Sequence, residues 1–116
     1  MSGKQVLNKE DALKRLAGDE DLWKEIIPMS LEDAPKYLTE IAKSLKIGNF
    51  DTARVSAHTL KSLMGNIGAD EAHHFAYETE HACKQEAKSD ATKAFQELLD
   101  ACDRLSNHIS ELDLDL

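Results

Sequence analysis

A histidine and a lysine one helical turn apart are the residues of this 116-residue chain whose types and spacing point to chemistry. They are His58 and Lys61. A neutral imidazole is nucleophilic near pH 7 because its unperturbed pKa is about 6.5. An ammonium one turn away can neutralise oxygens of a phosphoryl group as a mobile point charge. Phosphoryl transfer needs chiefly positioning and charge compensation, so the pair is suited to hold a phosphoryl group. An isolated exposed histidine would carry no such implication.

The residues around His58 predict the helix that positions it. Apolar residues recur at spacings of three and four, which indicates one buried helix face: Phe50, Ala53, Ala57, Leu60, Met64 and Ile67. At about 100° per residue, His58 points roughly 130° away from the centre of that stripe, and therefore toward solvent. Its neighbours one turn away on the same helix are small or cationic, with no carboxylate among them: Arg54, Val55, Lys61, Ser62 and Gly65.

Two short segments of this helix carry a family resemblance. Ala57–Lys61 reads AHTLK and Gly65–Ala69 reads GNIGA. Together they resemble the signature of histidine-containing phosphotransfer (HPt) domains of bacterial-type phosphorelays, and the resemblance extends from about Asn8 to Lys88. In that family the histidine accepts and donates a phosphoryl group and the lysine three residues on supports it. The partner is a receiver domain with a phosphorylatable aspartate.

The resemblance implies roles for residues of this chain. His58 would be the phosphoryl acceptor and donor and Lys61 would stabilise the phosphoryl group. The surrounding helix face would dock the partner through Arg54, Val55, Ser62 and Gly65. Ser62 departs from the family, which most often has glycine directly after the lysine to leave room for the partner's loop. Glu80 and Lys84 fall where the family often places polar residues close to the histidine, and an ordinary solvated helix face remains the alternative for both.

The function that follows is a phosphorelay intermediate. It would accept a phosphoryl group on His58 from a receiver aspartate or a kinase, and pass it to the aspartate of another receiver. A hybrid histidine kinase is among the expected partners. No cofactor is expected on this chain, and Mg²⁺ is expected on the receiver. The sequence has no Walker lysine loop and no glycine-rich nucleotide fingerprint, so ATP binding and autokinase activity are not expected. The dimerisation helices of histidine kinases are another kind of helical bundle with a phosphorylatable histidine. They usually have an acidic residue directly after that histidine, where this chain has Thr59, so the sequence disfavours this alternative.

A different class of function stays open. The chain could be a helical interaction module that docks receiver domains without carrying phosphate, with His58 as a docking residue. A metal site is a further alternative, because His74, Glu78 and His81 share one helix face. Zinc sites usually draw ligands from more than one element, which favours a solvated face and no metal here.

Composition restricts the partners. A net charge of −8 argues against nucleic acid and anionic membranes as partners. No apolar run approaches the length of a membrane span, and no signal-peptide core follows Met1. Cys83 and Cys102 are too few and too far apart for a metal knuckle, and both fall on apolar helix faces. Buried reduced thiols in a cytoplasmic protein are therefore expected. The protein is also expected to be a monomer.

The periodicity predicts an all-α fold, an antiparallel up-down-up-down four-helix bundle with a short extra N-terminal helix. Residues 1–7 are expected to be a flexible lead, residues 8–113 a single HPt-like domain and residues 114–116 a frayed end. Asn8 and Asp19 are predicted N-caps, and Gly18 is predicted to end the short helix, which would cover one end of the bundle.

The course of the second predicted helix and the start of the last one are the features that the spacing of residues defines least. One apolar register runs from Trp23 to Ile47 across Pro28 and Pro35, which allows either one long helix kinked at the prolines or two collinear helices. The turn before the last helix is placed at Lys88-Ser89. The last helix then has a seam at alternating spacings of four and three: Ala91, Phe95, Leu98, Cys102, Leu105, Ile109 and Leu112.

Overall fold

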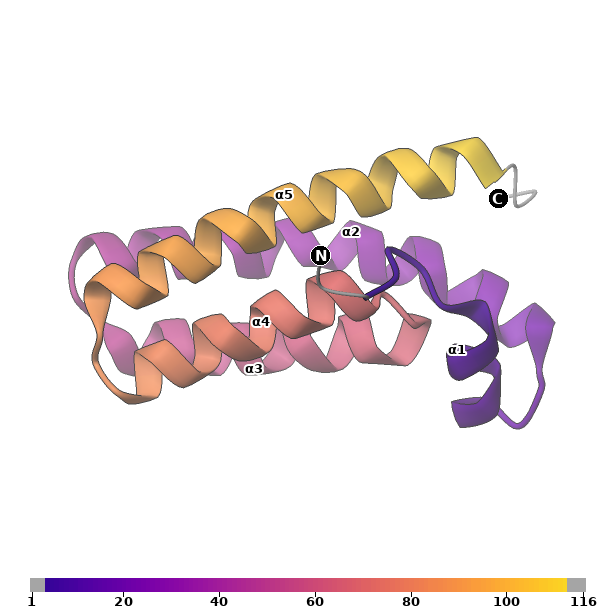
Figure 1. The fold of residues 1–116 in the computed structure, drawn as a ribbon, viewed down its shortest axis with the longest axis horizontal. Helices are drawn as coiled ribbons and strands as arrows, with labels where there is room; N and C mark the ends of the chain where they lie inside the picture. The colour runs from indigo at the N-terminus through magenta and orange to yellow at the C-terminus, as the bar shows by residue number, and fades with distance from the viewer. Residues whose placement is uncertain (1–3, 113–116) are drawn as a thin grey trace.

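The computed structural model describes residues 4–112, which form five helices (Figure 1). They are α1 (Lys9–Arg15), α2 (Glu20–Lys46), α3 (Phe50–Ile67), α4 (Asp70–Lys84) and α5 (Lys88–Leu112). Helices α2 to α5 run antiparallel to their neighbours in sequence, and each packs extensively on the next; the contact between α2 and α5, which closes the bundle, is much smaller. The predicted four-helix bundle with a short N-terminal helix is confirmed.

The predicted caps explain where the first helices begin. The side chain of Asn8 accepts a hydrogen bond from the amide of Asp11, and that of Asp19 accepts one from the amide of Leu22. Asn49, which is not among the predicted caps, caps α3 in the same way by accepting from the amide of Thr52. Each cap satisfies an amide that has no partner within its own helix. The helix that carries His58 therefore starts at a position that its own sequence specifies.

Helix α2 is continuous through both prolines, from Glu20 to Lys46. Of the two alternatives, the single long helix is therefore the one observed. A proline in a helix removes one backbone hydrogen bond. Buried side chains on both sides of the prolines, from Trp23 and Ile27 to Ala34 and Ile41, hold α2 against the core and offset that loss.

The turn between α4 and α5 differs from the prediction. The turn lies at residues 85–87, and Lys88 and Ser89 already belong to α5. Glu86 takes a left-handed φ of +53°. The amide of Ala87 bonds back to the carbonyl of Ala82, which closes the end of α4. Left-handed turns of this kind favour glycine, so the glutamate gave no signal of the turn.

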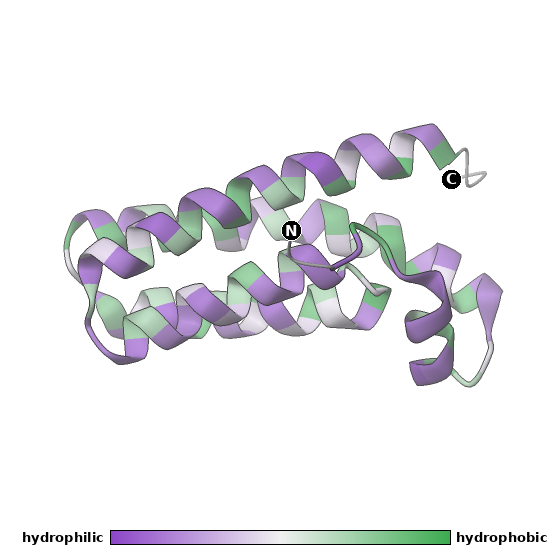
Figure 2. Ribbon diagram, in the orientation of Figure 1, coloured by the Kyte–Doolittle hydropathy of each residue, from purple (hydrophilic) through white to green (hydrophobic). Residues whose placement is uncertain are grey.

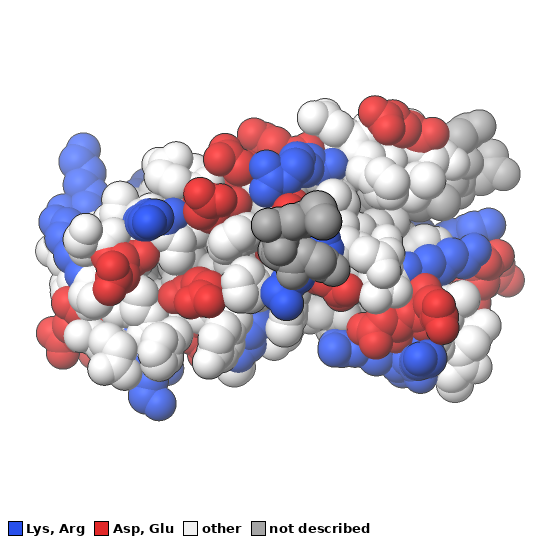
Figure 3. All heavy atoms as spheres, viewed as in Figure 1, with Lys and Arg blue, Asp and Glu red and all other residues white. Residues whose placement is uncertain are grey.

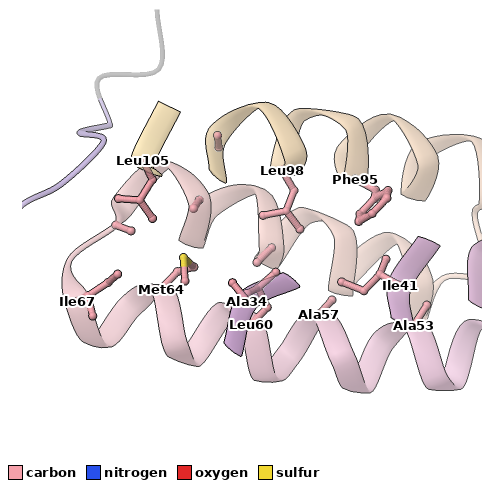
Figure 4. Close-up of a cluster of buried hydrophobic side chains, with 14 of the residues drawn as sticks. Ala34, Ile41, Ala53, Ala57, Leu60, Met64, Ile67, Phe95, Leu98 and Leu105 are labelled. Atoms are coloured by element: carbon pink, nitrogen blue, oxygen red, sulfur yellow. The ribbon is translucent and has the colours of Figure 1, made fainter. Parts of the chain in front are cut away.

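The core lies between the apolar faces of α2 to α5 (Figures 2 and 4). The predicted stripe of α3 is buried at Ala53, Ala57, Leu60, Met64 and Ile67, and Phe50 packs partly buried at its edge. The seam of α5 is confirmed except at two places. Ala101 is buried where Cys102 was expected, and Leu112 is exposed.

Cys102 is therefore half-buried, and Cys83 is buried as predicted; both thiols are free. Burial raises the pKa of Cys102 to about 11, and the nearby Asp103 carboxylate adds to the rise. Burial also raises the pKa of the Cys83 thiol. Neither cysteine is activated as a nucleophile, because the thiolate is the reactive form.

Residues before α1 lie against the bundle. Residues 1–3 of the predicted flexible lead, and residues 113–116 with the predicted frayed end, lie outside the described residues. Val6 and Leu7 pack partly buried on the core, and the carbonyl of Gln5 accepts a hydrogen bond from the amide of Glu71. These contacts connect the segment to the start of α4.

Helix α1 covers the end of the bundle where α3 meets α4 (Figure 1). The amide of Asn8 donates to the carbonyl of Gly68 at 2.7 Å, and Ala12 is fully buried. Gly68 has a φ of +82°, and a side chain there would overlap the carbonyl oxygen of Asn8. A glycine is therefore needed both for the turn and for the close approach of α1.

Candidate functional site

His58 projects from the middle of α3 on the side opposite the core. Its side chain is 58% exposed, while Ala57 and Leu60 beside it are fully buried. The exposure predicted from helical periodicity is therefore observed. Short, well-packed neighbours on the buried side hold the helix, so the position of His58 is set by a rigid element.

A carboxylate from the next helix holds the His58 ring. Glu80 of α4 places Oε2 2.8 Å from Nδ1 of His58. Its other oxygen, Oε1, lies 2.7 Å from Nζ of Lys61. One carboxylate thus contacts both candidate site residues. On α3 alone the histidine has no acidic neighbour, as predicted, but the fold brings one from α4 and the surface around His58 is not purely small and cationic.

The charge state of Glu80 determines which ring nitrogen of His58 carries the proton. Burial alone would raise the pKa of Glu80, but the hydrogen bonds and charges of Lys61 and His58 outweigh burial and lower that pKa below its usual range. Glu80 is therefore ionised near neutral pH and can only accept hydrogen bonds. Nδ1 of His58 must be the donor, so in the neutral ring Nε2 keeps the lone pair.

Lys61 is the more enclosed member of the pair, with 22% of its side chain exposed. Its ammonium pairs with Glu80 and lies 5.7 Å from the ring centre of Tyr77. Tyr77 is itself about half-exposed and stacks on His81. Contacts with α4 thus hold the ammonium beside the imidazole, where it can also pair with a second anion.

The four residues of the predicted docking face lie in different environments. Val55 is 54% exposed and Ser62 is exposed, with its hydroxyl donating to the carbonyl of His58 at 3.3 Å. Arg54 is half-buried. Gly65 is buried beneath Arg15 of α1 and His73 of α4. The side chains of Arg54, Val55 and Ser62 therefore reach the surface around His58, whereas Gly65 has no side chain and leaves space for its neighbours.

The two candidate site residues on α4, Glu80 and Lys84, differ in their contacts. Glu80 contacts both His58 and Lys61, whereas Lys84 is exposed and makes no hydrogen bond or ion pair within residues 4–112. Tyr77, one turn before Glu80, was not singled out from the sequence. The only sequence signal that could have indicated it is the spacing of three to Glu80.

The three residues of the metal alternative do not converge. His74 Nε2 lies 3.5 Å from Glu78 Oε1, but His81 stacks on Tyr77 at a ring-centre distance of 6.1 Å. Among residues 4–112, no three His, Cys, Asp or Glu side chains come close enough together to hold a metal ion.

None of the helices in the described part of the chain is long and apolar enough to cross a membrane.

Several solved structures with this fold carry the names of phosphotransfer proteins or domains. The HPT domain of the Hpt sensor hybrid histidine kinase from Shewanella is 21% identical, with a TM-score of 0.82 over 96% of this chain and 96% of that one. Histidine-containing phosphotransfer protein B from Pseudomonas aeruginosa is 16% identical, with a TM-score of 0.81 over 91% and 92%. The maize histidine-containing phosphotransfer protein is 19% identical, with a TM-score of 0.79 over 95% and 85%. At these identities the likeness concerns the fold.

No curated protein matches the sequence. The family model of the Hpt domain, however, matches residues 25–108, which include α3, α4 and the His58–Glu80–Lys61 contacts. The match covers well over half of the chain, and the bundle has the fold of solved phosphotransfer proteins. The chain therefore belongs to the Hpt domain family, whose members take part in phosphotransfer in phosphorelays.

Proposed function

We propose that this protein accepts a phosphoryl group on Nε2 of His58 from the aspartate of a receiver domain, or from a kinase, and passes it to the aspartate of another receiver domain. The observation that carries the proposal is the exposed imidazole whose Nδ1 is bound by the Glu80 carboxylate, with the Lys61 ammonium on the same carboxylate. This arrangement leaves Nε2 as the nucleophile on an open face.

The transfer step follows from this geometry. Nε2 attacks phosphorus of the aspartyl phosphate, the N–P bond forms as the P–O bond to the aspartate breaks, and the aspartate leaves as a carboxylate. The imidazole then carries a positive charge with its proton still on Nδ1, and the Glu80 carboxylate 2.8 Å away stabilises that charge. The reverse step returns the phosphoryl group to a second aspartate and restores the neutral ring.

Lys61 would compensate charge on the phosphoryl group. Its ammonium is one turn from His58 and is already oriented by Glu80 and Tyr77. Because three N–H donors are available on an ammonium, it can keep the Glu80 contact and donate to a phosphoryl oxygen as well. The magnesium ion and the acceptor aspartate would be supplied by the receiver, so this chain is one half of a shared active site.

The partners proposed are receiver domains, among them one that could belong to a hybrid histidine kinase. Such partners imply a cytoplasmic protein, and a monomer would leave the His58 face open for them. The exposed Val55 and Ser62 support docking on this face, because they surround His58 without covering it.

The direct test is phosphoryl transfer from a labelled receiver domain. The purified protein is incubated with receiver domains phosphorylated from a small phosphodonor, and any label that it gains is treated with acid and with alkali. Label that survives alkali but not acid is phosphohistidine and supports the proposal. Receivers that bind the protein but transfer no label would instead support a docking module that carries no phosphate.

Glu80 can support phosphoryl transfer in two ways, by orienting the His58 ring and by supplying a negative charge beside it. We expect Glu80→Ala to slow phosphoryl acceptance roughly tenfold, because Nδ1 loses its acceptor and the two ring tautomers become mixed. Glu80→Gln should recover part of the rate, since an amide oxygen can still accept from Nδ1 but carries no charge to stabilise the imidazolium. Single-turnover transfer rates of both variants test this. A Gln variant as slow as the Ala variant would show that the charge, not the orientation, supports transfer.

Ser62 replaces the glycine that its family most often has, and its hydroxyl donates to a backbone carbonyl of its own helix, that of His58. We expect Ser62→Gly to lower the free energy of unfolding by roughly 0.5 kcal/mol, because glycine is a poorer helix former. Receiver binding and transfer should be kept or improved, since the change removes a side chain from the open face. Thermal melts and binding titrations measure both effects. Weaker binding at unchanged stability would identify Ser62 as a contact residue for the partner.

A further inference from the structure

Helix α1 brings a guanidinium to the helix face that carries His58. Gly65 lies seven residues after His58 on α3, and seven residues are close to two full turns, so both positions point in nearly the same direction. A Cβ atom at Gly65 would lie 3.1 Å from Nη1 of Arg15 and 3.1 Å from Cδ2 of His73. The missing side chain at Gly65 is therefore what allows Arg15 to lie on this face.

The contacts of α1 hold Arg15 at this place. The amide of Asn8 donates to the Gly68 carbonyl at 2.7 Å, and its side chain donates to Asp70 at 3.0 Å. Ala12 is fully buried on the bundle. The Arg15 side chain itself remains 52% exposed, and within residues 4–112 it makes one ion pair, a long contact of 3.8 Å between Nε and Asp11. Its guanidinium thus has donors left for another anion.

Arg15 also lies close enough to His58 to meet the same partner. Seven residues of helix separate the two positions on α3 by about 10.5 Å along its axis. A standard protein interface covers about 800 Å² on each side, which corresponds to a disc of roughly 16 Å radius. A receiver centred on His58 with an interface of that size would therefore cover the position of Arg15.

We propose that Arg15 is a docking residue for the receiver domain, and that α1 is part of the docking surface. The inference rests on the proposed function. A receiver that carries an acceptor aspartate and carboxylate ligands for Mg²⁺ presents an acidic site. Three cationic residues lie on the His58 face that would meet this acidic site. Arg54 lies one turn before His58, Lys61 lies one turn after it, and Arg15 lies over Gly65. The protein as a whole has a net charge of −8, and acidic and basic side chains are interspersed on the face shown in Figure 3. Glu80 pairs with Lys61 and Asp11 pairs with Arg15, so the three cations and two carboxylates together keep one net positive charge. This small positive charge on a protein of net charge −8 favours the approach of an acidic partner to this face.

The test compares Arg15→Ala with Lys14→Ala. Lys14 is the neighbouring residue of α1, is exposed and pairs with Glu10 at 3.9 Å, so its removal changes the net charge equally. The probe is a receiver domain that has transferred phosphate to His58 of the wild-type protein. We expect Arg15→Ala to raise the Kd for this receiver about threefold to fivefold at low salt, and Lys14→Ala to change it by less than about twofold. Arg15→Lys should recover most of the affinity, and the effect should shrink at high salt.

The transfer rate at saturating receiver should stay at the wild-type value in Arg15→Ala, because the guanidinium docks the partner and does not act on the reacting atoms. Equal Kd values for the Arg15 and Lys14 variants, whether both are changed or neither, would overturn the inference while His58 still accepts phosphate. A wild-type protein that gains no phosphohistidine from any receiver would overturn the proposed function, and the docking role of Arg15 with it. Thermal melts of each variant confirm that the compared proteins are folded.

Discussion

Replacing His58 by glutamine is expected to abolish phosphoryl acceptance and leave the fold intact. Glutamine is polar and can still hydrogen-bond to Glu80, but its amide nitrogen is not a nucleophile. Because the His58 side chain is 58% exposed, the free energy of unfolding should change by less than about 0.5 kcal/mol. The measurement is the acid-labile label gained from a phosphorylated receiver, together with a thermal melt.

His81→Gln is the matched control for this experiment. His81 is also an exposed histidine, on α4, and its ring stacks on Tyr77 without contacting Glu80. This variant should accept phosphate as the wild-type protein does. Acid-labile phosphate on the His58→Gln variant would show that another histidine is the acceptor, and the proposed role of His58 would be wrong.

Gly68→Ala is expected to cost more stability than alanine at Gly18 or Gly48, the other two glycines with a left-handed φ within residues 4–112. Two costs add at this position. A left-handed φ of +82° costs a residue with a side chain about 1–2 kcal/mol. The new Cβ would also overlap the carbonyl oxygen of Asn8 and lie 3.0 Å from Cβ of Ala12, and such overpacking costs typically about 1–3 kcal/mol more. Urea unfolding should therefore show a loss of roughly 3 kcal/mol.

Gly48→Ala isolates the first of these costs. Gly48 has a φ of +76°, but a Cβ there would meet nothing within 4 Å. Its variant should lose only about 1–2 kcal/mol. Equal losses in the two variants would show that α1 can move away from Gly68 without cost. If the structure is right, Gly68→Ala should also displace α1, and with it the Arg15 guanidinium.

The sequence by itself determined those features of the protein that depend on interactions within a single helix. The N-caps at Asn8, Asp19 and Asn49 act on amides three residues away, so their patterns are legible in the chain. The solvent exposure of His58 follows from the apolar spacing of α3, since the angle between residues of one helix is nearly constant. The bundle follows from four such helices joined by short turns.

The tertiary structure alone decided how residues on different helices meet. The rotation of α4 about its own axis against α3 sets which of its polar residues reaches His58, and it brings Glu80 and not Lys84. The packing of α1 decided that Gly65 is buried under Arg15 instead of facing a partner.

Two smaller differences have the same origin. At the α4–α5 turn, Glu86 adopts a left-handed φ although nothing in its residue type favours it, because the neighbouring helices must be joined at that place. The packing of α5 against the other helices buries Ala101 more fully than Cys102, although both lie on apolar spacings of the same helix. Periodicity defines the buried face of a helix to within about one residue, since adjacent positions differ by about 100°. The depth and orientation of each helix depend on side-chain packing between helices, which has no counterpart in the spacing of residues along one chain.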